Sequence, residues 1–185
     1  MLTSFSQAVA EHVSVVQGLE TCRAVIEQGR AAIVAALTSG GKVLLCGNGG
    51  SAADCQHIAA EMVVRYQKIR RPLAAIALTT DTSILTAHSN DFDFSSVFSR
   101  QVEALGRKGD CLIALSTSGN SPNVVEAASV ARRQGVVVIG MTGGNGGALS
   151  GLADHAIIVP CDVTARIQEA HILIAHWWCQ SLEDL

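Results

Sequence analysis

The chain has 185 residues, 49% of them hydrophobic but only 4% aromatic, and its formal net charge at pH 7 is -3. This length suits one domain with an aliphatic core, and the charge gives no electrostatic basis for binding nucleic acid or an anionic membrane surface. We therefore expect a single domain over 1–185, with neither nucleic acid nor membrane as a partner.

The cysteines are scattered, without a CxxC pair or the spacing of a metal finger. Several lie inside apolar runs, which is typical of reduced, buried thiols in a cytosolic protein. The N-terminus shows neither a basic region nor a long apolar core, and no apolar stretch approaches the roughly 18 residues of a membrane span. We expect a soluble, cytoplasmic protein.

Residues 3–38 carry apolar side chains at spacings of three and four, which predicts one or two amphipathic helices with a break near Gly29. This helical arm, over 1–38, precedes a core over 39–185. It either packs against another subunit or folds back on its own domain, and the first alternative leads us to expect an oligomer.

The stretch over 42–66 joins a predicted strand, Lys42 to Cys46, to a helix through the glycine-rich turn Gly47 to Ser51. Backbone N–H groups converge at such a turn, and the helix dipole favours an anion there. Such turns also occur for backbone reasons alone, and GNGGS is neither a dinucleotide nor a Walker sequence. A phosphate site and a purely structural turn therefore both remain open.

His57 and Glu61 lie four residues apart on the helix that follows. Their side chains project from one face, where they could share a metal ion or a substrate proton. A solvated helix face is the alternative.

The next elements alternate between strand and helix. We expect a strand over 73–78, a short helix around 83–88 capped by Thr or Asp, a loop holding Asn90 and Asp91, a helix over 94–105 and a strand over 110–115.

The loop from Ser116 to Pro122 has four hydroxyls in its first six residues, a glycine for close approach and Pro122 at the first helical position. A capping turn needs only one hydroxyl, so the excess favours a ligand such as a sugar phosphate, with an ordinary capped turn as the alternative.

A helix over 124–134, a strand over 136–141, a glycine-rich turn over 142–147 that we interpret as structural, a short helix ending near Leu152 and a strand over 155–159 follow. This alternation predicts a parallel, doubly wound sheet, in which ligands bind at the carboxyl ends of the strands. Both candidate anion loops begin at such ends.

The last helix, 164–182, carries His171 and His176 on a largely apolar background, where each is more typical of a core or interface residue than of a ligand. Glu169 and His176 align within about 20° on a helix, whereas Gln168 and His176 lie roughly 80° apart. Spacing alone therefore favours Glu169 over Gln168 as the partner of His176.

Five separated blocks resemble the sugar isomerase (SIS) superfamily, and within it the phosphoheptose isomerases. They are CGNGGSAADCQHIAAE at 46–61, LTTDTSILTAHSND at 78–91, FSRQVEALGRKGD at 98–110, STSGNS at 116–121 and RIQEAHILIAH at 166–176. The resemblance implies a three-layer αβα sandwich with a five-stranded parallel, flavodoxin-like sheet. It also implies the isomerisation of sedoheptulose 7-phosphate to D-glycero-D-manno-heptose 7-phosphate through an enediol, at the start of heptose synthesis for lipopolysaccharide core or related glycoconjugates.

The same resemblance assigns site residues by matching position. Those implied to bind substrate are Asn48, Gly49, Gly50, Ser51, Glu61, Asn90, Asp91, Ser116, Thr117, Ser118, Ser121 and Gln168. One Zn²⁺ per subunit would be held by His57, Glu61, Gln168 and His176, with Glu61 and His176 as the catalytic acid/base pair. The family thus prefers Gln168 over Glu169, and it implies a homotetramer whose active sites lie at subunit interfaces.

His88 and Ser89 depart from the family pattern, which has smaller or apolar residues before Asn90. A rival family with the same fold, the DnaA initiator-associating proteins, acts as a noncatalytic partner in replication initiation. It resembles this chain but lacks an acidic residue at the position of Glu61 and a histidine at the position of His176. Because this chain keeps both, we expect the isomerase.

Overall fold

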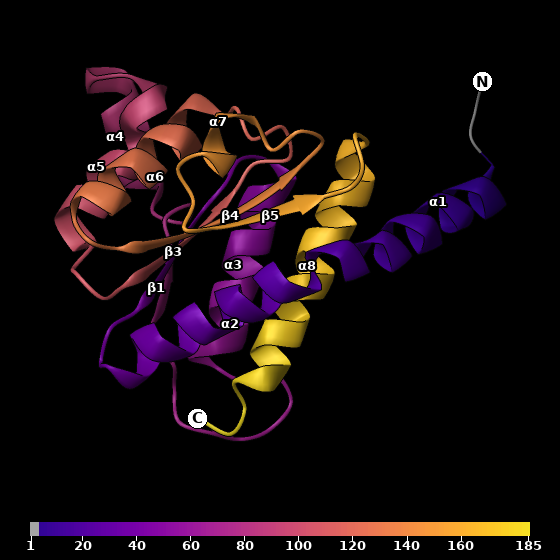
Figure 1. The fold of residues 1–185 in the computed structure, drawn as a ribbon. Coiled ribbons are helices and arrows are strands. Elements are labelled where there is room, and N and C mark those ends of the chain that lie inside the picture. Colours follow the sequence, from indigo (N-terminus) through magenta and orange to yellow (C-terminus); the bar gives the residue numbers. More distant parts are fainter. Residues whose placement is uncertain (1–3) are drawn as a thin grey trace.

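The computed structural model describes residues 4–185 and has a five-stranded parallel sheet at its centre (Figure 1). Its strands are β1 (Val43–Cys46), β2 (Ala75–Ala77), β3 (Cys111–Leu115), β4 (Val137–Gly143) and β5 (His155–Val159). They lie in the order β2-β1-β3-β4-β5, and every pair is parallel. The predicted fold class is confirmed.

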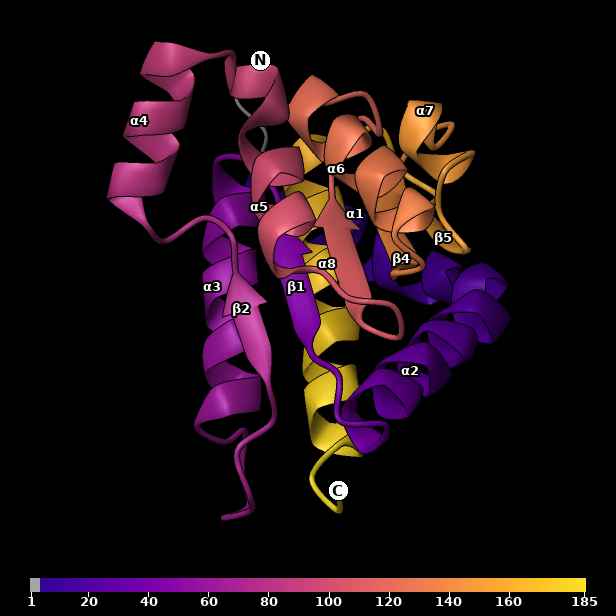
Figure 2. The same cartoon turned by 90° about the vertical axis from the view of Figure 1, so that its left-hand side faces the viewer.

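Helices cover both faces of the sheet (Figure 2). One face packs against α2 (Arg23–Thr38), α3 (Gly50–Val63) and α8 (Thr164–Ser181), and the other against α4 (Thr82–Asp91), α5 (Val97–Leu105), α6 (Pro122–Arg133) and α7 (Gly147–Ser150). Side chains of a strand alternate between the two sides: in β1, Leu45 lies in the first core and Leu44 in the second. The molecule is therefore a three-layer sandwich.

The strand order explains where a ligand can enter. From β1 the chain passes to β2 on one side and then to β3 on the other. The direction of the chain through the sheet therefore reverses between β1 and β3, and in such sheets ligands bind outside the carboxyl ends of the strands at this point. Both strands are fully buried.

The N-terminal arm consists of α1 (Phe5–Gly18), a 3₁₀ turn η1 (Leu19–Cys22) and α2. The break is therefore at η1, and its prediction near Gly29 was wrong. Gly29 lies inside α2, where an added Cβ would meet the Trp178 ring at 3.0 Å, so its small size serves the close packing of α2 on α8. Thr3, the first residue of the predicted helical range, lies outside the described residues.

Helix α1 extends from the body of the molecule (Figure 1). It is tied to α8 where the Arg166 guanidinium donates to the Ala8 carbonyl (2.7 Å) and where His12 Nδ1 lies 2.7 Å from Glu169 Oε2. Three of its apolar side chains are exposed in the single chain: Phe5, Val9 and Val13. This leaves an amphipathic helix with much of its apolar surface uncovered.

Most other predicted elements are present with small shifts at their ends. Asp81 caps α4 by accepting from the Ile84 N–H (3.0 Å), which confirms the expected Thr or Asp cap. Asn90 and Asp91 are the last two residues of α4, so their prediction as a loop was wrong. The helix predicted over 94–105 divides into η2 (Phe94–Ser96) and α5.

All six cysteines are free thiols and five are buried, as expected. Burial raises the pKa of Cys46 and Cys111 to about 12, which keeps both thiols protonated and unreactive. Within residues 4–185, none of the helices has the length and hydropathy needed to cross a membrane.

Candidate functional site

The glycine-rich turn after β1 and the serine-rich loop after β3 are joined by a pair of amides. Asn48 Nδ2 donates to Asn123 Oδ1 (2.9 Å), and Asn123 Nδ2 donates to Asn48 Oδ1 (2.8 Å). Asn123 is buried in the first turn of α6. Sequence reasoning missed Asn123, although a polar residue directly after the helix-starting Pro122 was a usable signal.

The turn after β1 brings backbone close to other groups. Gly49 has φ +56°, a conformation that favours glycine. A Cβ on Gly50 would lie 2.7 Å from Gln168 Nε2, so only glycine lets the Gln168 amide reach the start of α3. Ser51 follows, buried in the first turn of that helix.

Hydroxyls in the serine-rich loop bind one another. Ser116 Oγ and Ser121 Oγ are 2.9 Å apart, and Ser118 Oγ accepts from the Asn120 N–H (3.2 Å). Ser121 stands at the N-cap of α6, but its side chain makes no capping bond in the described residues. The hydroxyl that an ordinary N-cap would use is paired with Ser116 instead.

The third glycine-rich turn, 143–147, braces this loop. The Leu149 N–H donates to the Gly119 carbonyl (2.9 Å), and the Gly143 N–H donates to the Thr117 carbonyl (3.0 Å). Gly119 has φ +68°, and a Cβ there would overlap the Gly146 carbonyl oxygen. These contacts agree with the structural role that we expected for this turn.

A cavity of about 340 Å³ opens beside the serine-rich loop, between β4 and the start of α8. Its lining is mostly polar and includes Thr117, Ser118, Asn145, Asp162 and Thr164. Of the loop residues with hydroxyls, Thr117 and Ser118 thus border open space, whereas Ser116 is buried.

His57, Glu61 and His176 come together where α3 packs on α8. His57 Nε2 lies 2.8 Å from His176 Nε2 and 3.7 Å from Glu61 Oε1. The His57 side chain is 48% exposed and that of Glu61 21%, so the cluster opens to the surface. Two imidazoles and a carboxylate in this arrangement can exchange protons or share a metal ion.

Two further residues border this cluster and were missed from the sequence. Asp54 has an Oδ2 that is buried without a partner among the described residues, and burial raises its pKa while the nearby His57 and His176 oppose that rise. The Tyr66 ring centroid is 5.6 Å from that of His176. Asp54 precedes His57 by three residues, so helical spacing could have revealed it.

Gln168 and Glu169 point to different partners. Glu169 binds His12 of α1 and Arg166 of its own helix, each at 2.7 Å, so its carboxylate is occupied. The Gln168 amide lies against Gly50, about 10 Å along α3 from His57. The structure therefore brings His57, Glu61 and His176 together within one chain but leaves Gln168 beside the turn after β1.

Asn90 and Asp91 end α4, both exposed, and Asn90 Nδ2 donates to Asp91 Oδ1 (2.8 Å). As for metal binding, no cluster of three or more His, Cys, Asp or Glu over residues 4–185 has the arrangement of an ion site. The nitrogens of His57 and His176 nevertheless converge.

Two relatives in sequence are both named phosphoheptose isomerase. The SIS domain family matches residues 5–143. A phosphoheptose isomerase of Paramagnetospirillum magneticum is 54% identical over 183 residues, covering 98% of this chain and 95% of that protein. Phosphoheptose isomerase 1 of Campylobacter jejuni is 52% identical over 174 residues, covering 94% of each.

Solved structures agree with these sequences. A phosphoheptose isomerase from Neisseria gonorrhoeae superposes with a TM-score of 0.92 at 45% identity, covering 97% of both chains. The match includes the helical arm as well as the sheet. By sequence and by fold, this chain belongs to the SIS domain family and, within it, to the phosphoheptose isomerases.

Proposed function

We propose that the protein isomerises sedoheptulose 7-phosphate to D-glycero-D-manno-heptose 7-phosphate through an enediol. The observation that carries this proposal is the cluster of Glu61 with His57 and His176, which supplies a carboxylate and imidazoles at one place. The relatives named phosphoheptose isomerase support the substrate. Heptose synthesis for lipopolysaccharide core or a related glycoconjugate is the corresponding pathway.

The serine-rich loop and the turn after β1 hold the phosphate and the sugar. Their positions at the start of α6 and α3 let backbone N–H groups and hydroxyls donate to phosphoryl oxygens without a charged side chain. We assign phosphate and substrate binding to the residues of the family pattern: Asn48, Gly49, Gly50, Ser51, Asn90, Asp91, Ser116, Thr117, Ser118, Ser121 and Gln168.

Glu61 acts as the base on carbon. Its carboxylate removes the proton from one of C1 and C2 and returns it to the other, so that the enediol forms and collapses without a net change in protons. His176 moves a proton between the two substrate oxygens in the same step. His57, bonded to His176, holds that imidazole in position.

The donor set fits Zn²⁺. The two imidazole nitrogens lie 2.8 Å apart and Glu61 Oε1 lies 3.7 Å from His57 Nε2, and the Gln168 amide would be the fourth donor. Bound zinc would polarise the substrate carbonyl as a Lewis acid. Each subunit would hold one ion.

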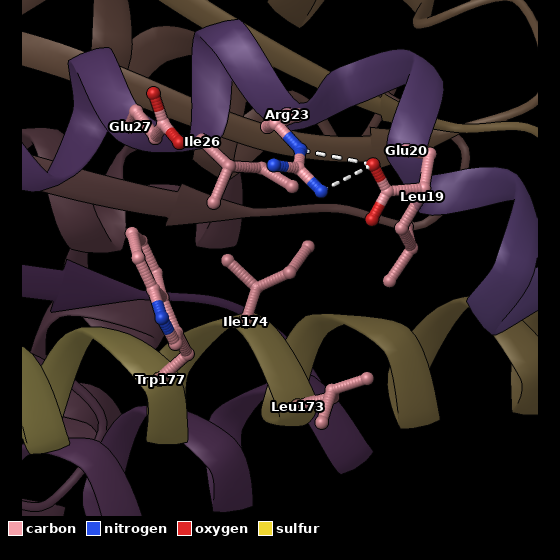
Figure 3. Close-up of a pocket in the computed structure, with 8 residues that line it drawn as sticks. All are labelled: Leu19, Glu20, Arg23, Ile26, Glu27, Leu173, Ile174 and Trp177. Carbon is pink, nitrogen blue, oxygen red and sulfur yellow. Dashed lines mark hydrogen bonds and ion pairs between the residues drawn. The ribbon is translucent and has the colours of Figure 1, made fainter.

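A homotetramer is the assembly that we propose, with active sites at subunit interfaces. A groove of about 360 Å³ between α2 and α8 supports this, because it is lined largely by apolar side chains such as Leu173 and Trp177, each about 40% exposed in one chain (Figure 3). Together with the exposed apolar side chains of α1, it offers surface for a neighbouring subunit to cover. The cytoplasm is the expected location of the enzyme.

The deciding experiment is an isomerase assay with sedoheptulose 7-phosphate, run with and without a chelator, beside zinc analysis of untreated protein. We expect turnover, about one zinc per subunit, and loss of rate after chelation. Absence of turnover in zinc-loaded tetramer would contradict the proposal, whereas turnover in metal-free protein would contradict only the role of zinc.

The alternative, a noncatalytic initiator-associating protein, is tested by a pull-down with the replication initiator. The presence of both Glu61 and His176 in one cluster disfavours it, because a binding module has no use for an acid/base pair. Binding of the initiator without isomerase activity would reverse the preference.

A further inference from the structure

Helix α4 is the least anchored element near the site. Leu85 and His88 are its half-buried residues, and the rest of Thr82–Asp91 is exposed. Leu85 packs against the core under α5 and α6. A helix held by so little apolar contact opens readily, and its end would fray unless other contacts hold it.

His88 supplies a contact at that end. Its Nε2 lies 2.8 Å from Ser96 Oγ in η2. Ser96 Oγ also lies 3.0 Å from the Asp93 carbonyl oxygen, to which its hydroxyl can donate. The imidazole therefore bridges the last turn of α4 to the next element.

Phe92 continues the bridge after Asn90 and Asp91, so the two residues lie in the chain between His88 and Phe92. The His88 and Phe92 rings stack with centroids 5.1 Å apart and an interplanar angle of 26°. The Phe92 N–H donates to the His88 carbonyl (2.9 Å), and the Arg100 guanidinium lies 5.8 Å from the centre of the Phe92 ring.

We propose that His88 is a positioning residue that holds Asn90 and Asp91 in place for the sugar. The inference rests on the proposed function, in which these two residues contact substrate. It assigns a role to His88, which the proposed function does not use: the imidazole anchors the end of α4 by a hydrogen bond and a ring stack. His88 itself does not touch the reacting atoms.

The test is the steady-state kinetics of His88→Ala and His88→Gln in the zinc-loaded enzyme with sedoheptulose 7-phosphate. His88→Ala should raise KM about five- to tenfold, the factor that loss of one neutral hydrogen bond produces, with kcat within about twofold. His88→Gln keeps an amide donor for Ser96 and should recover part of the loss. Ser89→Ala is the matched control, because the Ser89 hydroxyl bonds only within its own helix, to Leu85 (2.7 Å), and should leave KM unchanged.

Ser96→Ala removes the hydroxyl that contacts His88 without changing α4, so it should also raise KM. The double variant with His88→Ala should have a KM no higher than that of His88→Ala alone. Hydrogen exchange should show faster exchange of α4 amides in both variants, with the sheet unchanged. Unchanged KM in His88→Ala and Ser96→Ala, beside an active wild type, would overturn the inference. An inactive wild type would instead overturn the proposed function.

Discussion

The serine-rich loop and the cluster of His57, Glu61 and His176 are built in opposite ways. The loop is fixed by backbone: it follows a buried strand, and the turn at 143–147 packs directly against Gly119. The cluster is made of side chains on the outer surfaces of two helices, and the His57 side chain is 48% exposed. One region is complete within a single chain, and the other is open to solvent.

This difference matches what each region would have to do. A phosphate is the same in substrate and product, so a rigid backbone cradle can bind it throughout the reaction. An acid/base pair must change protonation at each turnover, which suits side chains with freedom to move. An exposed cluster also leaves room for a neighbouring subunit to close the site.

Glu61→Gln is the variant expected to separate the two regions most strongly. Loss of the carbon base should lower kcat by about 10² to 10⁴, the usual contribution of general acid/base catalysis, while binding of phosphate at the serine-rich loop stays. Isomerase kinetics and competition by inorganic phosphate measure the two effects. Glu126→Gln, on the exposed face of α6, is the control and should be unchanged. More than about a tenth of wild-type kcat in Glu61→Gln would contradict the assignment.

Gly119→Ala attacks the backbone region instead. The new Cβ would overlap the Gly146 carbonyl and would sit at φ +68°, so we expect a loss of about 3 kcal/mol or more in the free energy of unfolding. Gly40→Ala is the matched control, because Gly40 also has positive φ (+83°) but open space around it in the described structure. It should lose only about 1–2 kcal/mol. Equal losses in urea unfolding would show that packing against Gly146 is unimportant.

His171 connects the two regions, because it joins α8, which carries His176, to the end of β4. It is fully buried, its Nε2 lies 3.2 Å from the Thr142 carbonyl, and burial lowers its pKa from 6.5 to about 4. Between these two pH values, His171 binds a proton more readily in the unfolded chain than in the folded protein. Stability should therefore fall as the pH drops from about 6.5 to 4.

Protonation of His171 on unfolding should lower the free energy of unfolding by about 3 kcal/mol at pH 4 relative to pH 7. His171→Gln keeps a donor for Thr142 but does not titrate, so its urea unfolding should depend less steeply on pH than that of the wild type. Identical pH slopes would show that His171 is charged or solvated in the fold.

Asn123→Ala should give the smallest effect, because it removes one side of the amide pair with Asn48. We expect about 1–2 kcal/mol of lost stability, since the Asn48 amide is left without its partner, and a modest rise in KM. Gln28→Ala, at an exposed position of α2, is the control and should change stability by less than about 0.5 kcal/mol. If Asn123→Ala and the control lose equal stability, measured by thermal and urea unfolding, the amide pair does not join the two loops.

Local patterns were enough to predict most elements of the fold. The alternation of strand and helix patterns predicted the parallel sheet. The resemblance implied a flavodoxin-like sheet and the candidate site residues. The errors fall where packing competes with local preference. Gly29 predicts a break by propensity, yet α2 continues through it because the Trp178 ring needs the space. Asn90 and Asp91 favour a loop by composition, yet the Asp81 cap and the His88 contacts keep them in α4.

The site was predictable in its parts but not in its arrangement. Helical spacing favoured Glu169 over Gln168, and it could not show that Glu169 is engaged by His12 from the far end of the chain. Likewise, Asn123 is a candidate because it bonds Asn48, and Asp54 is a candidate because it lies near His57 and His176. Packing brings these partners together.

What the sequence determined by itself is therefore the chemistry: hydroxyls and glycines at the ends of buried strands, and a carboxylate and imidazoles at helical spacing, because these follow from residue type and local period. Only the tertiary structure decided which of them meet. The pairing of His57 with His176 depends on how α3 packs against α8, and contacts between segments more than a hundred residues apart are set by the whole core rather than by any local pattern.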